Sequence, residues 1–127
     1  MIPMQEPSPV TASLVDADAR PNFLPTFFGA RLMIRGEALV FGWLRALAVD
    51  YHGGYWNFYT LSNGGFYMAP AGSKPLRVMC EGNGFDDELS SDAAGIVVTL
   101  FALCQLANES EEDYIIDLYH LLREFLD

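Results

Sequence analysis

With 127 residues, of which 51% are hydrophobic and 19% charged, the chain is long enough for one domain with one core and too apolar for a disordered segment. The net charge is −10, and residues 81–127 carry twelve acids against one base. So acidic a surface repels phosphate, which argues against direct nucleic-acid binding and favours a basic protein partner.

The first residues predict a loosely held start. Pro3, Pro7 and Pro9 preclude a regular helix, so we expect a flexible N-terminal arm over residues 1–20 and a single domain over residues 21–127. No basic cluster precedes an apolar run, as it would in a signal peptide. The longest uncharged helical stretch, residues 93–107, is shorter than the roughly 20 residues that cross a bilayer. We therefore expect a cytoplasmic protein without a membrane partner, whose two cysteines, Cys80 and Cys104, are reduced and buried.

Two helices are predicted next. Aromatic and aliphatic residues at helical spacing follow Asn22, and Gly29 is expected to end that short helix. A second helix is expected over residues 34–49, although Gly36 and Gly42 weaken it. Its apolar stripe consists of Leu39, Trp43, Leu44 and Leu47.

The middle of the chain predicts four strands, over residues 55–61, 66–69, 76–80 and 85–89. Asn63-Gly64 and Asn83-Gly84 favour tight hairpin turns, because both residue types tolerate positive φ. Asp87 falls on the same face as Phe85 and Leu89, which predicts a bulge, an edge position or an early end of the fourth strand.

The last third predicts two more helices. Ser91 is a candidate N-cap for a helix over residues 93–107 that is apolar nearly all round, so we expect it to be covered on most sides. Ser110 and Asp113 resemble a capping box before a final amphipathic helix. The expected fold class is α+β: a single compact domain in which an antiparallel sheet of about four strands, over roughly residues 55–89, packs with N-terminal and C-terminal helices.

The residue pattern gives no catalytic, cofactor-binding or metal-ligating candidates. His52 and His120 have no second histidine or cysteine nearby, and the chain contains neither a G-x-S-x-G nucleophile elbow nor a P-loop. The aromatic block over residues 55–67 is interpreted first as core, with an exposed face as the alternative; the acids over residues 86–88 are interpreted first as a solvated edge. The candidate partner-binding residues are Tyr55, Trp56, Tyr67, Asn83, Asp86, Asp87, Glu88, Glu111, Glu112 and Asp113.

Several ordered segments carry a resemblance to a known family. They are Phe23-Leu24-Pro25, Arg35-Gly36-Glu37-Ala38-Leu39-Val40, Gly53-Gly54-Tyr55-Trp56, Leu61-Ser62-Asn63-Gly64-Gly65-Phe66-Tyr67-Met68-Ala69-Pro70, Gly82-Asn83-Gly84-Phe85, Leu89-Ser90 and Asp92-Ala93-Ala94-Gly95-Ile96. Together they resemble the plasmid antirestriction family called ArdB or KlcA, over about residues 22–107.

The resemblance implies inhibition of type I restriction-modification systems in the bacterial cytoplasm, which helps incoming plasmid or mobile-element DNA to survive, with no cofactor. The expected partner is the type I enzyme complex or an associated host factor, contacted by a monomer without catalysis. Two alternatives stay open. One is partial DNA mimicry by the C-terminal carboxylates; the other is a small enzyme with an unrecognised site.

Overall fold

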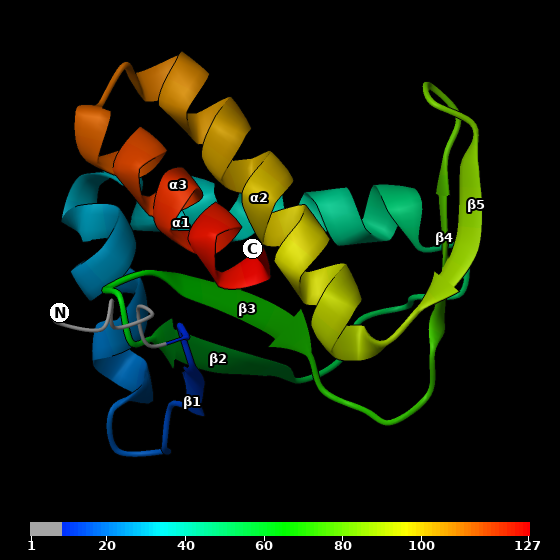
Figure 1. Ribbon diagram of the computed structural model, residues 1–127, viewed down its shortest axis with the longest axis horizontal. Helices are drawn as coiled ribbons and strands as arrows, with labels where there is room; N and C mark the ends of the chain where they lie inside the picture. Colours follow the sequence, from blue (N-terminus) through cyan, green and yellow to red (C-terminus); the bar gives the residue numbers. More distant parts are fainter. Residues whose placement is uncertain (1–8) are drawn as a thin grey trace, which may run out of the picture.

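Three helices and five short strands form residues 9–127, the part of the chain that the computed structural model describes (Figure 1). The elements are β1 (Ala12–Leu14), a 3-10 helix (Arg20–Asn22), α1 (Phe23–Leu47), β2 (Trp56–Leu61), β3 (Phe66–Pro70), β4 (Leu76–Cys80), β5 (Phe85–Leu89), α2 (Ser91–Ser110) and α3 (Asp113–Leu126). This confirms the α+β class and the positions of the four strands predicted over residues 55–89.

Helix α1 is broken at Gly29, where φ is 78° and ψ is 156°. The two helices predicted on either side of Gly29 are therefore present, although the second starts directly after the break. The break frees the carbonyl oxygen of Phe28, and the hydroxyl of Tyr114 on α3 donates a hydrogen bond to it at 2.6 Å. The carbonyl oxygen at the break therefore finds its hydrogen-bond donor in a residue 86 positions away.

The predicted sheet of about four strands is divided in two. Strands β1, β2 and β3 form one antiparallel sheet in that order, and β4 and β5 form a separate antiparallel pair. The physical reason is that α2 covers the edge of β3 that does not pair with β2. The backbone N–H of Met68 donates to the hydroxyl oxygen of Thr99 at 3.2 Å, and that hydroxyl donates to the Met68 carbonyl oxygen at 3.3 Å. With the Met68 backbone groups bonded to α2, β4 has no edge there to join.

Strand β1 belongs to the arm predicted over residues 1–20. Ala12 lies opposite Leu61 and Leu14 opposite Tyr59, and Val15 N–H donates to the Phe58 carbonyl oxygen at 2.8 Å. This part of the predicted arm is therefore paired to the sheet. Residues 1–8 of it lie outside the described residues.

The ends of α2 and α3 differ in detail from the predicted caps. Ser90, rather than Ser91, caps α2, since its side chain accepts a hydrogen bond from Ala93 N–H. Ser110 is the last residue of α2 and does not form the predicted capping box; Glu112 is the N-cap of α3 and has no side-chain cap bond. Asp113 lies in the first turn of α3, where a carboxylate stabilises the helix end.

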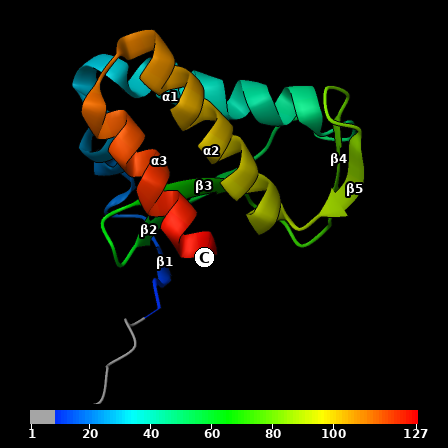
Figure 2. The same cartoon turned by 45° about the horizontal axis from the view of Figure 1, so that its top comes forward.

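Helix α2 lies at the centre of the fold, with α1, α3 and β3 packed on three sides of it (Figure 1). By length and composition alone it could cross a membrane, but core helices meet the same criterion, and eight of its residues are buried. The β4–β5 hairpin stands at one end of the molecule, beside the end of α1 (Figures 1 and 2). Both cysteines are free; Cys80 is half-buried and Cys104 is exposed, which corrects the expectation that both are buried.

Candidate functional site

The β4–β5 hairpin presents four of the candidate partner-binding residues. Asn83 lies in its turn and accepts a hydrogen bond from Phe85 N–H through its side-chain oxygen. Asp86 receives two hydrogen bonds from Arg77, at 3.0 and 2.9 Å, and these hold the pKa of its carboxyl below the ordinary value. Asp87 and Glu88 are exposed. The prediction of an edge position for Asp87 is confirmed, because β5 pairs with β4 alone.

The connection between α2 and α3 presents the other three acids. Glu111 caps the C-terminus of α2 in the left-handed conformation, with φ of 58°. Glu112 forms an ion pair of 2.6 Å with Arg31 of α1. Asp113 is exposed. This acidic group and the hairpin acids lie at opposite ends of the molecule in both views (Figures 1 and 2). The candidate acids therefore form two separate surfaces.

The aromatic candidates are mostly core. Trp56 is 5% and Tyr67 is 2% exposed, so neither offers a surface to a partner, and the interpretation of the block as core holds for them. Tyr67 donates a hydrogen bond of 2.7 Å to Asp92. Burial and this bond raise the pKa of Tyr67 well above its ordinary value. Tyr55, by contrast, is 61% exposed, and the guanidinium of Arg20 lies over its ring.

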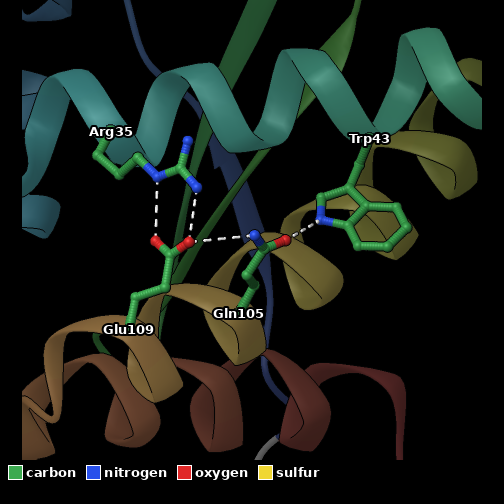
Figure 3. Close-up of polar contacts among 4 residues, drawn as sticks. All are labelled: Arg35, Trp43, Gln105 and Glu109. Atoms are coloured by element: carbon green, nitrogen blue, oxygen red, sulfur yellow. Dashed lines mark hydrogen bonds and ion pairs between the residues drawn. The ribbon is translucent and has the colours of Figure 1, made fainter.

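A polar network joins α1 to α2 across their exposed crossing (Figure 3). Arg35 donates two hydrogen bonds to Glu109, at 3.0 and 2.6 Å, and Gln105 donates a third at 3.2 Å. The indole N–H of Trp43 donates to the Gln105 side-chain oxygen at 3.0 Å. The bonds from Arg35 lower the pKa of Glu109, and they raise that of Arg35. A further acid of the C-terminal third is thus neutralised within the chain.

Helix α2 has an exposed apolar surface that was not predicted from the sequence. That helix was expected to be covered on most sides, but Phe101 is 37% exposed and Cys104 is exposed. A cavity of about 160 Å³ lies between this surface and the hairpin, and its lining includes Val78, Phe85 and Phe101. The absence of charge between Asp92 and Glu109 was the available signal, but it does not separate a buried helix from one with an open apolar side.

The described residues offer little for metal or acid–base chemistry. Within residues 9–127 no group of three or more histidine, cysteine, aspartate or glutamate side chains is arranged to hold a metal ion. The groups with displaced pKa values are the two arginine–carboxylate pairs and the buried Tyr67. Each of these groups has a hydrogen-bond partner within the chain.

The sequence of this small α+β protein matches one class of known proteins. Residues 49–127 match the family model described as "Antirestriction protein". With this match over more than half of the chain, and with the relatives below, the chain belongs to the antirestriction protein family, which confirms the resemblance seen in the sequence.

Individual relatives are similar over nearly the whole chain. One Escherichia coli protein described as "Antirestriction protein KlcA" is 60% identical over 121 residues, which cover 92% of this chain and 85% of that protein. A second protein of the same description and organism is 56% identical over 98% of this chain and 90% of its own length.

A solved structure agrees in fold as well, with a TM-score of 0.86, 57% identity and coverage of 96% of this chain and 89% of that one. It is described by the words "The structure of the KlcA and ArdB proteins show a novel fold and antirestriction activity against Type I DNA restriction systems in vivo but not in vitro".

Proposed function

We propose that this protein inhibits type I restriction-modification systems inside the host cell, by contact with another protein and without catalysis, and so protects incoming plasmid or mobile-element DNA. The observation that carries the proposal is the match to the KlcA and ArdB structure, which is 57% identical and is described as active against type I systems in vivo. At this identity and TM-score the surfaces of the two chains are built on the same backbone.

The partner is the type I enzyme complex or a host factor associated with it. The relative is described as active in vivo but not in vitro. A purified reaction lacks the other components of the cell, so this difference supports a requirement for a further host component. The protein acts in the cytoplasm, where that component and the restriction complex meet, and it acts as a monomer.

Contact through a packed surface is better supported than DNA mimicry. A duplex places one charge about every 1.7 Å along its axis, so a mimic needs carboxylates in continuous rows. Here the candidate acids lie on two surfaces at opposite ends of the molecule. Two of them, Asp86 and Glu112, are also ion-paired to arginines of the same chain.

The test is a plating assay with unmodified phage on cells that carry a type I system. Expression of the protein raises the plating efficiency, and cells of the same strain without the restriction subunit show no change. Addition of the purified protein to the purified type I enzyme leaves DNA cleavage unchanged unless cell extract is added. An unchanged plating efficiency in the restricting cells would reject the proposal.

A further inference from the structure

An apolar groove follows the exposed side of α2. The cavity beneath the hairpin adjoins a second hollow of about 440 Å³, lined by Trp43 and Cys104 among others, and a third of about 500 Å³ against α3. Phe101 lines all three, so they form one continuous surface, called the α2 groove below. It runs from the β4–β5 hairpin past Phe101 to Leu126 at the end of α3.

Large side chains are left open to solvent along this groove. Phe85 is 41%, Phe101 is 37% and Leu126 is 52% exposed, and Cys104 lies open between Phe101 and α3. Contiguous exposed apolar surface in a small protein commonly marks a site of protein interaction. Its position between two helices and a hairpin gives it the shape that accepts an amphipathic helix.

Charge at the hairpin end of the groove selects the partner. Asp87 lies opposite Val78 in the hairpin register, and directly opposed residues point to the same face of a sheet. That face is the groove side, because Val78, Phe85 and Leu89 line the cavity. Asp87 is exposed. Its carboxylate accepts a hydrogen bond from Glu88 N–H at 2.7 Å but forms no ion pair with any residue of the described chain, unlike Asp86 on the other face. A carboxylate without an ion-pair partner at the rim of an apolar groove favours a cation in the ligand.

The opposite end of the groove is different. Arg123 and Asp127 both line it, and the guanidinium of Arg123 donates to the hydroxyl of Tyr119 at 3.3 Å. The groove therefore has the unpaired carboxylate of Asp87 at the hairpin end and side chains of both charges at the α3 end. A second copy of this chain is a poor occupant, because two copies with a net charge of −10 each repel one another.

We propose that the α2 groove binds an amphipathic helix of a partner protein, with bulky apolar side chains against Phe101 and a lysine or arginine beside Asp87. The inference rests on the proposed function in one respect, namely that this groove is the surface through which the protein acts on the restriction machinery. The binding itself is independent of that function and is tested separately.

The binding test uses two synthetic helical peptides as probes. Both carry the same stripe of leucine and phenylalanine; one has lysines on its flanks and the other has glutamates at the same positions. The readout is the alkylation rate of the exposed Cys104 thiol in a Cys80→Ala background. The lysine peptide is expected to slow alkylation at concentrations where the glutamate peptide has no effect.

Reversal of the rim charge then tests the role of Asp87. Asp87→Lys is expected to weaken binding of the lysine peptide by roughly tenfold and to make the glutamate peptide protect the thiol. Equal protection by both peptides, no protection by either, or an unchanged preference in Asp87→Lys would overturn the proposal.

The functional test uses two matched surface variants in the plating assay. Cys104→Lys places a charge in the groove at an exposed position, and Ile34→Lys adds the same charge at a 77% exposed position on α1, outside the groove. Thermal unfolding confirms that both variants fold. Protection against restriction is expected to be lost in Cys104→Lys and kept in Ile34→Lys.

The outcomes separate the two proposals. A wild-type protein that gives no protection in cells, while the peptide results hold, would reject the proposed function and leave the binding groove standing. Full protection by Cys104→Lys would reject the groove as the acting surface. A dimer in sedimentation experiments that Cys104→Lys dissociates would make a second copy the occupant, which also overturns the proposal.

Discussion

Gly95 sets the distance between α2 and β3. A Cβ atom at this position would lie 2.4 Å from the Cβ of Ala69 and 2.4 Å from the carbonyl oxygen of Met68, both too close for any real contact. The neighbouring atoms belong largely to backbone, which cannot rotate away. The glycine is therefore required by packing, although it sits in the interior of a helix.

We predict that Gly95→Ala destabilises the protein by about 1–3 kcal/mol, the usual cost of an overpacked core. The matched control is Gly42→Ala in α1, where an added Cβ has no neighbour within 4 Å. That change is expected to stabilise the protein by up to about 1 kcal/mol, because alanine is the better helix former. Urea unfolding of both variants measures the difference, and an equal gain in both would show that α2 can move away from β3.

Tyr67 gives the free energy of unfolding a specific pH dependence. Its pKa is raised from 10.0, first by burial and then by the hydrogen bond to Asp92. The folded state therefore keeps the phenol proton at a pH where the unfolded chain releases it. The resulting stability is fully present below pH 10 and is lost as the pH rises through the raised pKa. The free energy of unfolding should fall above about pH 10, by up to about 1.4 kcal/mol per pH unit from this group.

The variant Tyr67→Phe isolates this effect from the other groups that titrate in the same range. It is expected to be less stable than the wild type at pH 7, since the partly buried hydrogen bond to Asp92 is lost, and to show a shallower decline above pH 10. Unfolding curves at several pH values measure both slopes. Parallel slopes in the two proteins would contradict the prediction.

Helices α1 and α2 pack against each other, and an exposed polar network also joins them. The Arg35 and Glu109 side chains are 52% and 39% exposed, so solvent screens their attraction. The bonds from Arg35 lower the pKa of Glu109. The network therefore stabilises the fold above the ordinary glutamate pKa and is lost as the pH falls through the lowered value.

We predict that Glu109→Gln lowers the melting temperature slightly at pH 7 and low salt. The deficit should disappear near 1 M salt, where the screening length is only about 3 Å. Thermal scans of the wild type and the variant at both salt concentrations provide the measurement. A deficit that persists at high salt would mean that the shape of the network, rather than its charge, holds the helices.

At the scale of helices, strands and turns, local sequence was sufficient to predict some features and not others. Both Asn-Gly pairs lie in hairpin turns as expected, because turn geometry depends on adjacent residues. Positive φ is adopted by the glycines, Gly64 at 96° and Gly84 at 74°, and not by the asparagines, and each turn spans four residues between its strands. The division of the strands into two sheets was not predictable from local pattern. It depends on Thr99 bonding the backbone of Met68, a contact 31 residues apart in sequence. The choice between Ser90 and Ser91 as the cap was likewise open, since both side chains are able to cap a helix.

At the scale of the whole molecule, the acidic surface at the α2–α3 connection distinguishes contact from mimicry. We predict that the triple variant Glu111→Lys, Glu112→Lys and Asp113→Lys still protects phage in the plating assay. The reason is that these acids lie at the end of the molecule remote from the hairpin and that Glu112 is already paired with Arg31. Loss of protection by a folded triple variant would instead favour phosphate mimicry through this surface.

The candidate functional surface was only partly predictable from the sequence. The family was identified because its segments keep their residues and order, and the acids were placed on the surface because carboxylates are rarely buried unpaired. The sequence did not predict which aromatic residues are buried. Tyr55 and Trp56 are neighbours, yet Tyr55 is 61% exposed and Trp56 only 5%. Exposure of Phe101 depends on how α3 and the hairpin flank α2, which no local pattern encodes.

The way in which the three-stranded sheet is bounded has a consequence for solubility. One border is β1, a strand of only three residues, and at the other border Thr99 and Gly95 bring a helix against the backbone of β3. Short borders and covered borders both deter foreign strands from extending a sheet, which is a common route to aggregation. The three-stranded sheet is therefore expected to resist extension by a strand of another chain.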